Sequence, residues 1–210
     1  MQGVESQENR VVTFDYKEIS NPDADLTSKI ENAFGPNGLG LCIVTGVPNF
    51  VEKRARLLPL AHKLANLPKE ELDKITFPEI HYSLGWSHGK EKFKGTIDYS
   101  KGSFYGNAQK EDRIPKYEDQ DQSVTFNPWP EAIPELKDAF KDLGQLIVDV
   151  GTELAHHIDK YIEMKEPKYE KGKLTRILKE ADNVIGRLLH YFPSMNQLLL
   201  YLSCRRKERN

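Results

Sequence analysis

The chain has 210 residues, of which 38% are hydrophobic and 30% charged, and its formal net charge is -2. This length suits one compact domain with its own core, and the clustering of the apolar residues argues against a disordered chain. A nearly neutral charge provides no basic stripe to replace phosphate counterions, so we expect no nucleic-acid partner. The two cysteines, Cys42 and Cys204, lie far apart, which favours a reducing compartment.

The start of the chain shows no targeting pattern. Residues 1–10 are polar and acidic, and we expect a flexible N-terminus without the features of a secretory signal or a transit peptide. The longest apolar run, Leu198–Leu202, is too short to cross a bilayer. We therefore expect a cytoplasmic protein that makes no membrane contact.

The first elements predicted along the chain are strand, helix and strand. β-Branched and aromatic residues at 11–16 predict a half-buried strand. Apolar residues between Leu26 and Phe34 recur at helical spacing. The apolar run at 39–48 then predicts a strand that is buried on both faces.

Two more helices are predicted before the pattern weakens. The first begins after Asn49, and Pro59 inside it predicts a kink or a restart. The second begins at Leu67-Pro68-Lys69-Glu70, where a proline and acidic residues suit a helix N-terminus. Between Ile80 and Val124 the periodicity fades, which predicts loops with one or two short strands.

The clearest predicted helix starts near Pro134. Its apolar residues keep a spacing of three to four, and we expect this stripe to contribute more to the core than any other element. The stripe consists of Leu136, Phe140, Leu143, Ile147, Val150, Leu154 and Tyr161. Glu166-Pro167 ends the helix, a shorter helix follows, and residues 183–193 form a predicted strand.

Several segments, in this order, resemble the iron(II)- and 2-oxoglutarate-dependent oxygenases, the non-haem dioxygenase superfamily that includes isopenicillin N synthase. They are the glycine-flanked strand at 38–47, the turn at 67–70, the segments 85–91 and 101–105, and Arg187–Pro193, which is similar to the family's Arg-x-x-Asn-Tyr-Tyr-Pro strand. The resemblance implies an α+β fold. Residues 11–182 would be the N-terminal helical region of such an oxygenase, and residues 183–193 would be the strand that leads into its double-stranded β-helix, of which only a small remnant sheet is expected here.

The resemblance also suggests residues for a substrate pocket and a cosubstrate site. Trp86, His88, Phe104 and Tyr105 lie where family members wall the substrate pocket. Tyr191 matches a residue of the strand that contacts 2-oxoglutarate, whereas His190 and Phe192 replace the polar side chains of the family pattern. The structural alternative is that Trp86 covers the core and that His88 bonds to its own glycine-rich turn.

The family's metal site requires a His-x-Asp pair, a distant second histidine and an Arg-x-Ser that binds the far carboxylate of 2-oxoglutarate. None of these follows Pro193, so we expect no catalytic residue, no metal ligand and no cofactor in this chain, although full-length relatives use Fe(II) and 2-oxoglutarate. A literal His-x-Asp occurs at His157-Ile158-Asp159, inside the long helix. Residues two apart on a helix point in different directions, which predicts a packing histidine and a solvated aspartate rather than a metal site.

These observations lead to three hypotheses. The first is a truncated oxygenase-like protein, an oxidoreductase by resemblance, that is inactive alone and whose full-length relatives oxidise small organic molecules. The second is a non-catalytic interaction module that binds a full-length relative or another protein, and the open sheet edge at 183–193 predicts self-association or such a partner. The third is a divergent metalloenzyme that uses His156, His157, Asp159 or His190. Residues 194–210 depart from the family pattern and are predicted to be a divergent tail.

Overall fold

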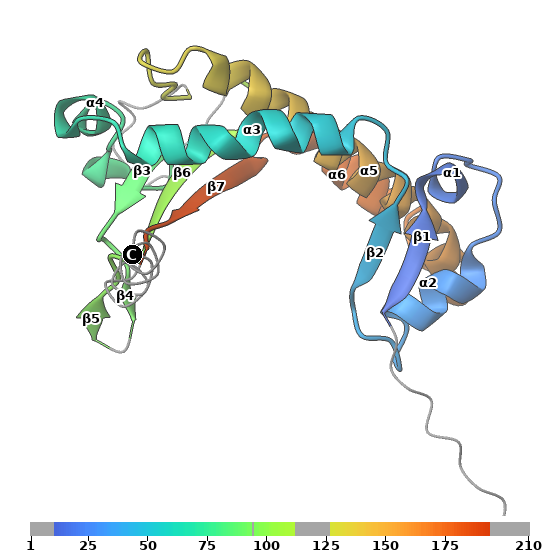
Figure 1. The fold of residues 1–210 in the computed structure, drawn as a ribbon. Coiled ribbons are helices and arrows are strands. Elements are labelled where there is room, and N and C mark those ends of the chain that lie inside the picture. Colours follow the sequence, from blue (N-terminus) through green and yellow to red (C-terminus); the bar gives the residue numbers. More distant parts are fainter. Residues whose placement is uncertain (1–10, 94, 112–126, 194–210) are drawn as a thin grey trace, which may run out of the picture. The chain divides into compact units, whose positions relative to one another are not determined.

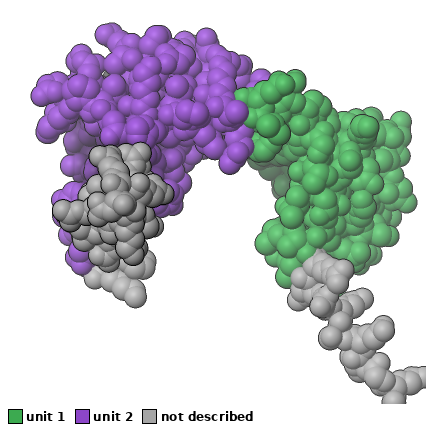
Figure 2. Space-filling view, viewed as in Figure 1, with its two compact units in different colours: residues 1–52, 145–181 green, residues 53–144, 182–210 purple. Residues whose placement is uncertain are grey.

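The computed structural model describes residues 11–93, 95–111 and 127–193. The predicted N-terminal extension at 1–10 and the predicted tail at 194–210 lie outside these residues. The chain forms two compact units (Figure 2): unit 1 contains residues 1–52 and 145–181, and unit 2 contains residues 53–144 and 182–210. Two helices, α3 (Phe50–Ala65) and α5 (Glu135–Lys165), contribute residues to both units.

Unit 1 is built on a two-stranded parallel sheet (Figure 1). Besides parts of α3 and α5, its elements are β1 (Val12–Asp15), α1 (Tyr16–Ile19), α2 (Thr27–Phe34), β2 (Cys42–Thr45) and α6 (Lys173–Glu180). β1 pairs with β2 from Val12 opposite Cys42 to Asp15 opposite Thr45. Phe14 on the inner face is fully buried with Ile19 and Ile30, which gives this unit a core of its own.

The expectation that the second strand is buried on both faces is wrong. β2 is only four residues long, and Ile43 on its outer face is 49% exposed. Cys42 and Val44 alternate with it and pack against the core. The sequence run is apolar on both faces, but the described residues cover only one of them.

Unit 2 is built on a three-stranded antiparallel sheet in the order β3-β6-β7. Its other elements are α4 (Lys69–Asp73), the 3₁₀ helix η1 (Pro78–Ile80) and the hairpin β4 (Lys92–Phe93) with β5 (Thr96–Ile97). The sheet strands are β3 (Gly85–His88), β6 (Lys101–Asn107) and β7 (Ile185–Tyr191). The expectation of one or two short strands between Ile80 and Val124 is therefore wrong, because β6 is a seven-residue strand in the middle of the sheet.

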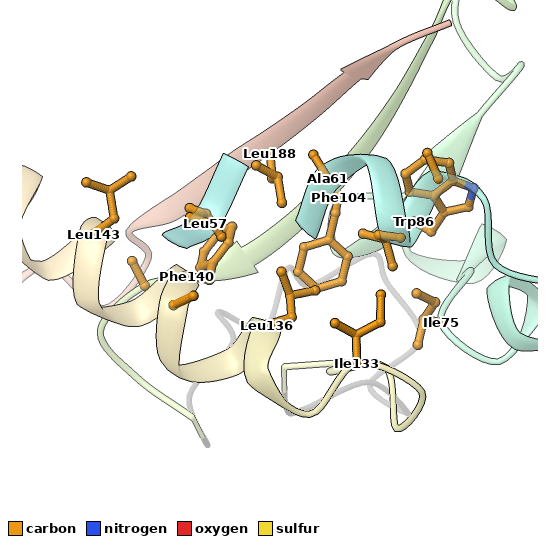
Figure 3. Close-up of a cluster of buried hydrophobic side chains, with 14 residues drawn as sticks. Leu57, Ala61, Ile75, Trp86, Phe104, Ile133, Leu136, Phe140, Leu143 and Leu188 are labelled. Carbon is orange, nitrogen blue, oxygen red and sulfur yellow. The ribbon is translucent and has the colours of Figure 1, made fainter. Parts of the chain in front are cut away.

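The core of unit 2 lies between this sheet, α3 and the first turns of α5 (Figure 3). Phe104 from β6 and Leu188 from β7 point toward Leu136 and Phe140 of α5 and Leu57 of α3. The Phe140 ring meets the Phe104 ring edge to face at a centroid distance of 5.9 Å. Aromatic pairs favour this arrangement over flat stacking.

The long helix is confirmed as one continuous element that ends at Lys165, just before Glu166-Pro167. One member of the predicted stripe is misplaced, since Ile147 is 57% exposed. Of the two alternatives predicted at Pro59, the restart is wrong, because α3 passes through this residue as one helix, and the kink stays a prediction. Together, the helices and small sheets confirm an α+β fold.

Candidate functional site

The sheet of unit 2 separates the predicted site residues onto two faces. Trp86 lies opposite Phe104 in the β3·β6 register, and His88 shares their face because alternate strand residues point to the same side. Tyr105 lies opposite Arg187, and Tyr191 lies opposite Lys101, both on the other face. The five predicted site residues therefore do not line a single wall. One face of the sheet carries Trp86, His88 and Phe104, and the other carries Tyr105 and Tyr191.

On the inner face, Trp86 and Phe104 are buried in the hydrophobic core. A side chain on Gly102 would lie only 2.2 Å from the Trp86 ring, so the glycine leaves room for the indole above β6. The structural alternative for Trp86 is thus confirmed. The substrate-pocket role of both aromatic residues stays a prediction.

Beside Trp86, three imidazoles gather at one end of the inner face. The ring centroids of His88 and Phe192 are 4.7 Å apart, those of His190 and Phe192 4.8 Å, and those of His190 and His62 from α3 5.3 Å. His88 is hydrogen-bonded through Nε2 to the carbonyl of Tyr99 at 3.1 Å rather than to its own turn. Burial lowers the pKa of His190, and the neighbouring imidazole of His62 lowers it further. Sequence reasoning missed His62, because its position on an exposed helix face carries no signal.

The outer face carries a network of charged and polar groups. The Arg187 guanidinium donates hydrogen bonds of 2.8 Å to Ser103 Oγ and to Glu91 Oε1, and it lies 5.1 Å from the centre of the Tyr105 ring. Lys101 pairs with the other oxygen of Glu91 at 2.7 Å. Tyr191 lies on the same face and is 65% exposed.

Glu91 links the two cations of this face. The hydrogen bond from Lys101, together with the charge of Arg187, lowers the pKa of Glu91, and the same hydrogen bond raises the pKa of Lys101. Both shifts favour the charged forms of Glu91 and Lys101 at neutral pH. A carboxylate ligand would have to displace Glu91 from Arg187 or Lys101, so this face is a closed ion-pair network rather than a vacant anion site.

The only His-x-Asp of the sequence is used for packing. His157 is buried, and its Nε2 donates a hydrogen bond of 2.9 Å to the carbonyl of Ile19. The prediction of a packing histidine is confirmed. The prediction that Asp159 faces solvent is wrong, because Asp159 is buried and accepts hydrogen bonds from Tyr169, Leu174 and Thr175.

These bonds test whether the residues present fit the iron site that the resemblance implies. A metal ligand needs a free nitrogen or carboxylate lone pair directed at the ion. His157 directs its Nε2 at the carbonyl of Ile19, and both carboxylate oxygens of Asp159 already accept two hydrogen bonds each. The pair does not fit an iron site.

Within 11–93, 95–111 and 127–193, no group of three or more His, Cys, Asp or Glu side chains is placed to hold a metal ion. In the same ranges, no helix combines the length and apolarity that a membrane span requires.

Comparison with solved structures shows which fold this is. The chain is similar to a putative 2OG-Fe(II) oxygenase family protein from Caulobacter crescentus, with 17% identity and a TM-score of 0.67 over 89% of this chain and 58% of that one. It is also similar to the C-terminally truncated Neurospora crassa protein NcT7HdeltaC in apo form, with 18% identity and a TM-score of 0.59 over 91% of this chain and 66% of that one.

The full-length Neurospora crassa protein, in complex with alpha-KG and 5-formyluracil, gives a TM-score of 0.65 at 17% identity over 96% of this chain and 59% of that one. No protein-family model matches the sequence, and no curated protein does. The chain therefore has part of the fold of the 2-oxoglutarate/Fe(II) oxygenases. It spans between 58% and 66% of the length of these structures.

Proposed function

We propose that this chain is a truncated 2-oxoglutarate/Fe(II) oxygenase-like protein of the cytoplasm that does not turn over 2-oxoglutarate by itself. The comparison supports the first part of this proposal, since the chain spans only 58–66% of the length of the solved structures that it resembles. In a complete oxygenase of this type, Tyr191 would contact 2-oxoglutarate, and the substrate would be a small organic molecule.

One observation carries the proposal that the chain is inactive alone: its single His-x-Asp pair is part of the scaffold. His157 joins α5 to the end of α1, and Asp159 joins α5 to the start of α6. Moving either side chain toward a metal would break buried hydrogen bonds, and a buried polar group without a partner costs about 1–3 kcal/mol.

The test is succinate formation from 2-oxoglutarate by the purified chain with Fe(II), compared with a metal-free control. We expect no difference between the two, and no saturable Fe(II) binding by calorimetry. Succinate above the control that is lost in His157→Ala and retained in His156→Ala would overturn the proposal, because it would assign catalysis to the helical His-x-Asp.

A second candidate function is an interaction module. It is favoured by β7, which pairs with β6 over seven residues and lies at the edge of the sheet in the described part of the chain. An edge strand of this length can add a strand from another polypeptide. The test is a double substitution on β7. Antiparallel pairing of two β7 strands around Leu188 would place Ile185 of one copy opposite Tyr191 of the other. Ile185→Lys combined with Tyr191→Lys would place two lysines opposite each other and should prevent this pairing. Association that survives this double change would exclude the β7 edge.

A further inference from the structure

The imidazoles of His62 and His190 form a pair that the proposed function does not use. His62 lies on α3 and His190 on β7, and both residues belong to unit 2. Their ring centres are 5.3 Å apart, and the ring planes are inclined at 78°. The pair therefore brings together two nitrogen-bearing side chains from elements that are far apart in the sequence.

The ring nitrogens of this pair are not engaged by the described part of the chain. Among residues 11–93, 95–111 and 127–193, no hydrogen bond or ion pair reaches the imidazole of His62 or His190. In the same ranges no side-chain nitrogen is both buried and without a partner, so the His190 nitrogens are accessible to solvent. His88 and His157 differ, because each directs its Nε2 at a backbone carbonyl.

His190 is held in the state that a metal ligand requires. A metal ion binds the neutral imidazole, whose nitrogen lone pair is free. Burial lowers the pKa of His190, and the imidazole of His62 lowers it further, so His190 is neutral at pH 7. The Phe192 ring, which packs against the core of unit 2, meets the His190 ring at a right angle with a centroid distance of 4.8 Å. This contact restricts the orientation of His190 before any ion binds.

The separation of the two rings fits a shared ion. Zinc–nitrogen bonds of about 2.0–2.1 Å in a tetrahedral site place the centres of two ligating imidazoles roughly 5 Å apart. The distance between His62 and His190 is close to this value. His62 is exposed on α3, so its ring can rotate to direct a nitrogen at the ion that His190 binds. Imidazole nitrogens suit copper and zinc, whereas Mg²⁺ and Ca²⁺ prefer oxygen ligands.

We propose that His62 and His190 bind a divalent transition-metal ion, Cu²⁺ or Zn²⁺, and so join α3 to β7. The protein supplies two ligands and water supplies the others, since no larger group of ligands is placed to hold an ion in the described ranges. The role is structural, and the proposal does not depend on 2-oxoglutarate chemistry. It departs from the sequence-based expectation that the chain has no metal ligand. Fe²⁺ binds nitrogen ligands much more weakly than Cu²⁺, so the site agrees with the absence of saturable Fe²⁺ binding that is expected above.

The test is titration of the full chain with Cu²⁺, followed by calorimetry and by electron paramagnetic resonance. Wild type should bind one Cu²⁺ at this site, and the spectrum should show hyperfine coupling to two imidazole nitrogens. Loss of an outer partner of a metal ligand already costs about 10–100-fold in affinity, so His62→Ala and His190→Ala should each weaken binding about tenfold or more. Each variant should retain coupling to one imidazole nitrogen.

His156→Ala is the matched control. The rings of His156 and His157 are also in contact, with centroids 5.6 Å apart, but the Nε2 of His157 is bound to a carbonyl. This control should therefore bind Cu²⁺ as wild type does. Cu²⁺ should also raise the unfolding temperature of wild type more than that of His62→Ala, because an ion that binds only the folded chain stabilises it.

The outcomes separate a metal site from a packing contact. Cu²⁺ binding that is weakened in His62→Ala and His190→Ala but kept in His156→Ala supports the proposal, provided that circular dichroism shows each variant to be folded. If His190→Ala does not fold, His62→Ala decides alone, because His62 is exposed. Wild type without saturable Cu²⁺ binding overturns the proposal, since the two rings would then only pack. Binding that survives the double change His62→Ala, His190→Ala, or a spectrum with a sulfur ligand, also overturns it.

Discussion

Asp159 shows how a side chain on one helix can cap another. The N-cap of α6 is Gly172, which has no side chain to offer, and the first amides of a helix need hydrogen-bond acceptors. Asp159 supplies them from α5, since its two oxygens accept hydrogen bonds of 2.9 Å from the amides of Leu174 and Thr175. Sequence spacing did not reveal this role, because it depends on how α6 packs against α5. The two amides lie 15 and 16 residues after Asp159 in the chain.

We predict that Asp159→Ala destabilises unit 1 by roughly 2–4 kcal/mol, since it removes the acceptors of the first α6 amides and leaves these donors, and those of Tyr169 and Thr175, without partners. Urea denaturation followed by circular dichroism would measure this change in the free energy of unfolding. Asp149→Ala, which changes an exposed aspartate on the same helix and in the same unit, should stay within about 0.5 kcal/mol of wild type. Equal effects in the two variants would show that Asp159 is not a cap.

The same side chain makes stability depend on pH. Burial works against ionisation of Asp159, but the hydrogen bonds from Tyr169, Thr175 and Leu174 outweigh it and lower its pKa. In the acid range, the unfolded chain therefore binds more protons at Asp159 than the folded chain does. The contribution of Asp159 to folding stability is complete above its pKa in the unfolded chain, which is about 4, and is lost as the pH falls through its lowered pKa in the folded chain. The Asp159→Ala variant should lack this part of the acid sensitivity of wild type.

At the scale of elements, the sequence predicted the helices better than the strands. The long helix repeats its apolar spacing over many turns, so its pattern is visible without knowledge of its neighbours. β6 is different, because its Gly102 and Gly106 weaken a strand pattern. Gly102 makes space for the Trp86 ring and Gly106 for the Trp129 ring, and that reason appears only once the sheet is assembled.

The apolar stripe of α5 contains both buried and exposed positions, which can be distinguished by mutation. Phe140→Ala should cost about 3–5 kcal/mol, since its buried ring packs against Phe104 and Trp129 at centroid distances of 5.9 and 5.5 Å. Ile147→Ala should cost about 0.5 kcal/mol or less in the monomer, because that side chain is mostly exposed. Thermal unfolding at low protein concentration would compare the two, and similar losses would contradict the difference in burial.

At the scale of the molecule, the motifs identified the fold but not the arrangement of the site. The order of Gly38–Val47, Leu67–Glu70 and Arg187–Pro193 was enough to indicate the oxygenase fold that the solved structures share. Which sheet face each site residue occupies depends on the β3-β6-β7 register, and sequence alone does not determine the pairing of strands so far apart. The division into two units was not visible either, because α3 and α5 are continuous helices that serve both.

The two units have separate hydrophobic cores, so damage to one core should first be detected in its own unit. Ile30 is fully buried in unit 1 and Leu188 is buried in unit 2, and none of the residues that the structure describes belongs to both cores. Ile30→Ala should cost about 2–5 kcal/mol and speed amide hydrogen exchange in β1, α2 and β2 more than in β3, β6 and β7, whereas Leu188→Ala should do the reverse. Hydrogen exchange measured by mass spectrometry of peptides would follow both units in one experiment. If either substitution accelerated exchange equally in all six elements, the chain would unfold as one cooperative body, because local opening of a single core could not expose the amides of the other.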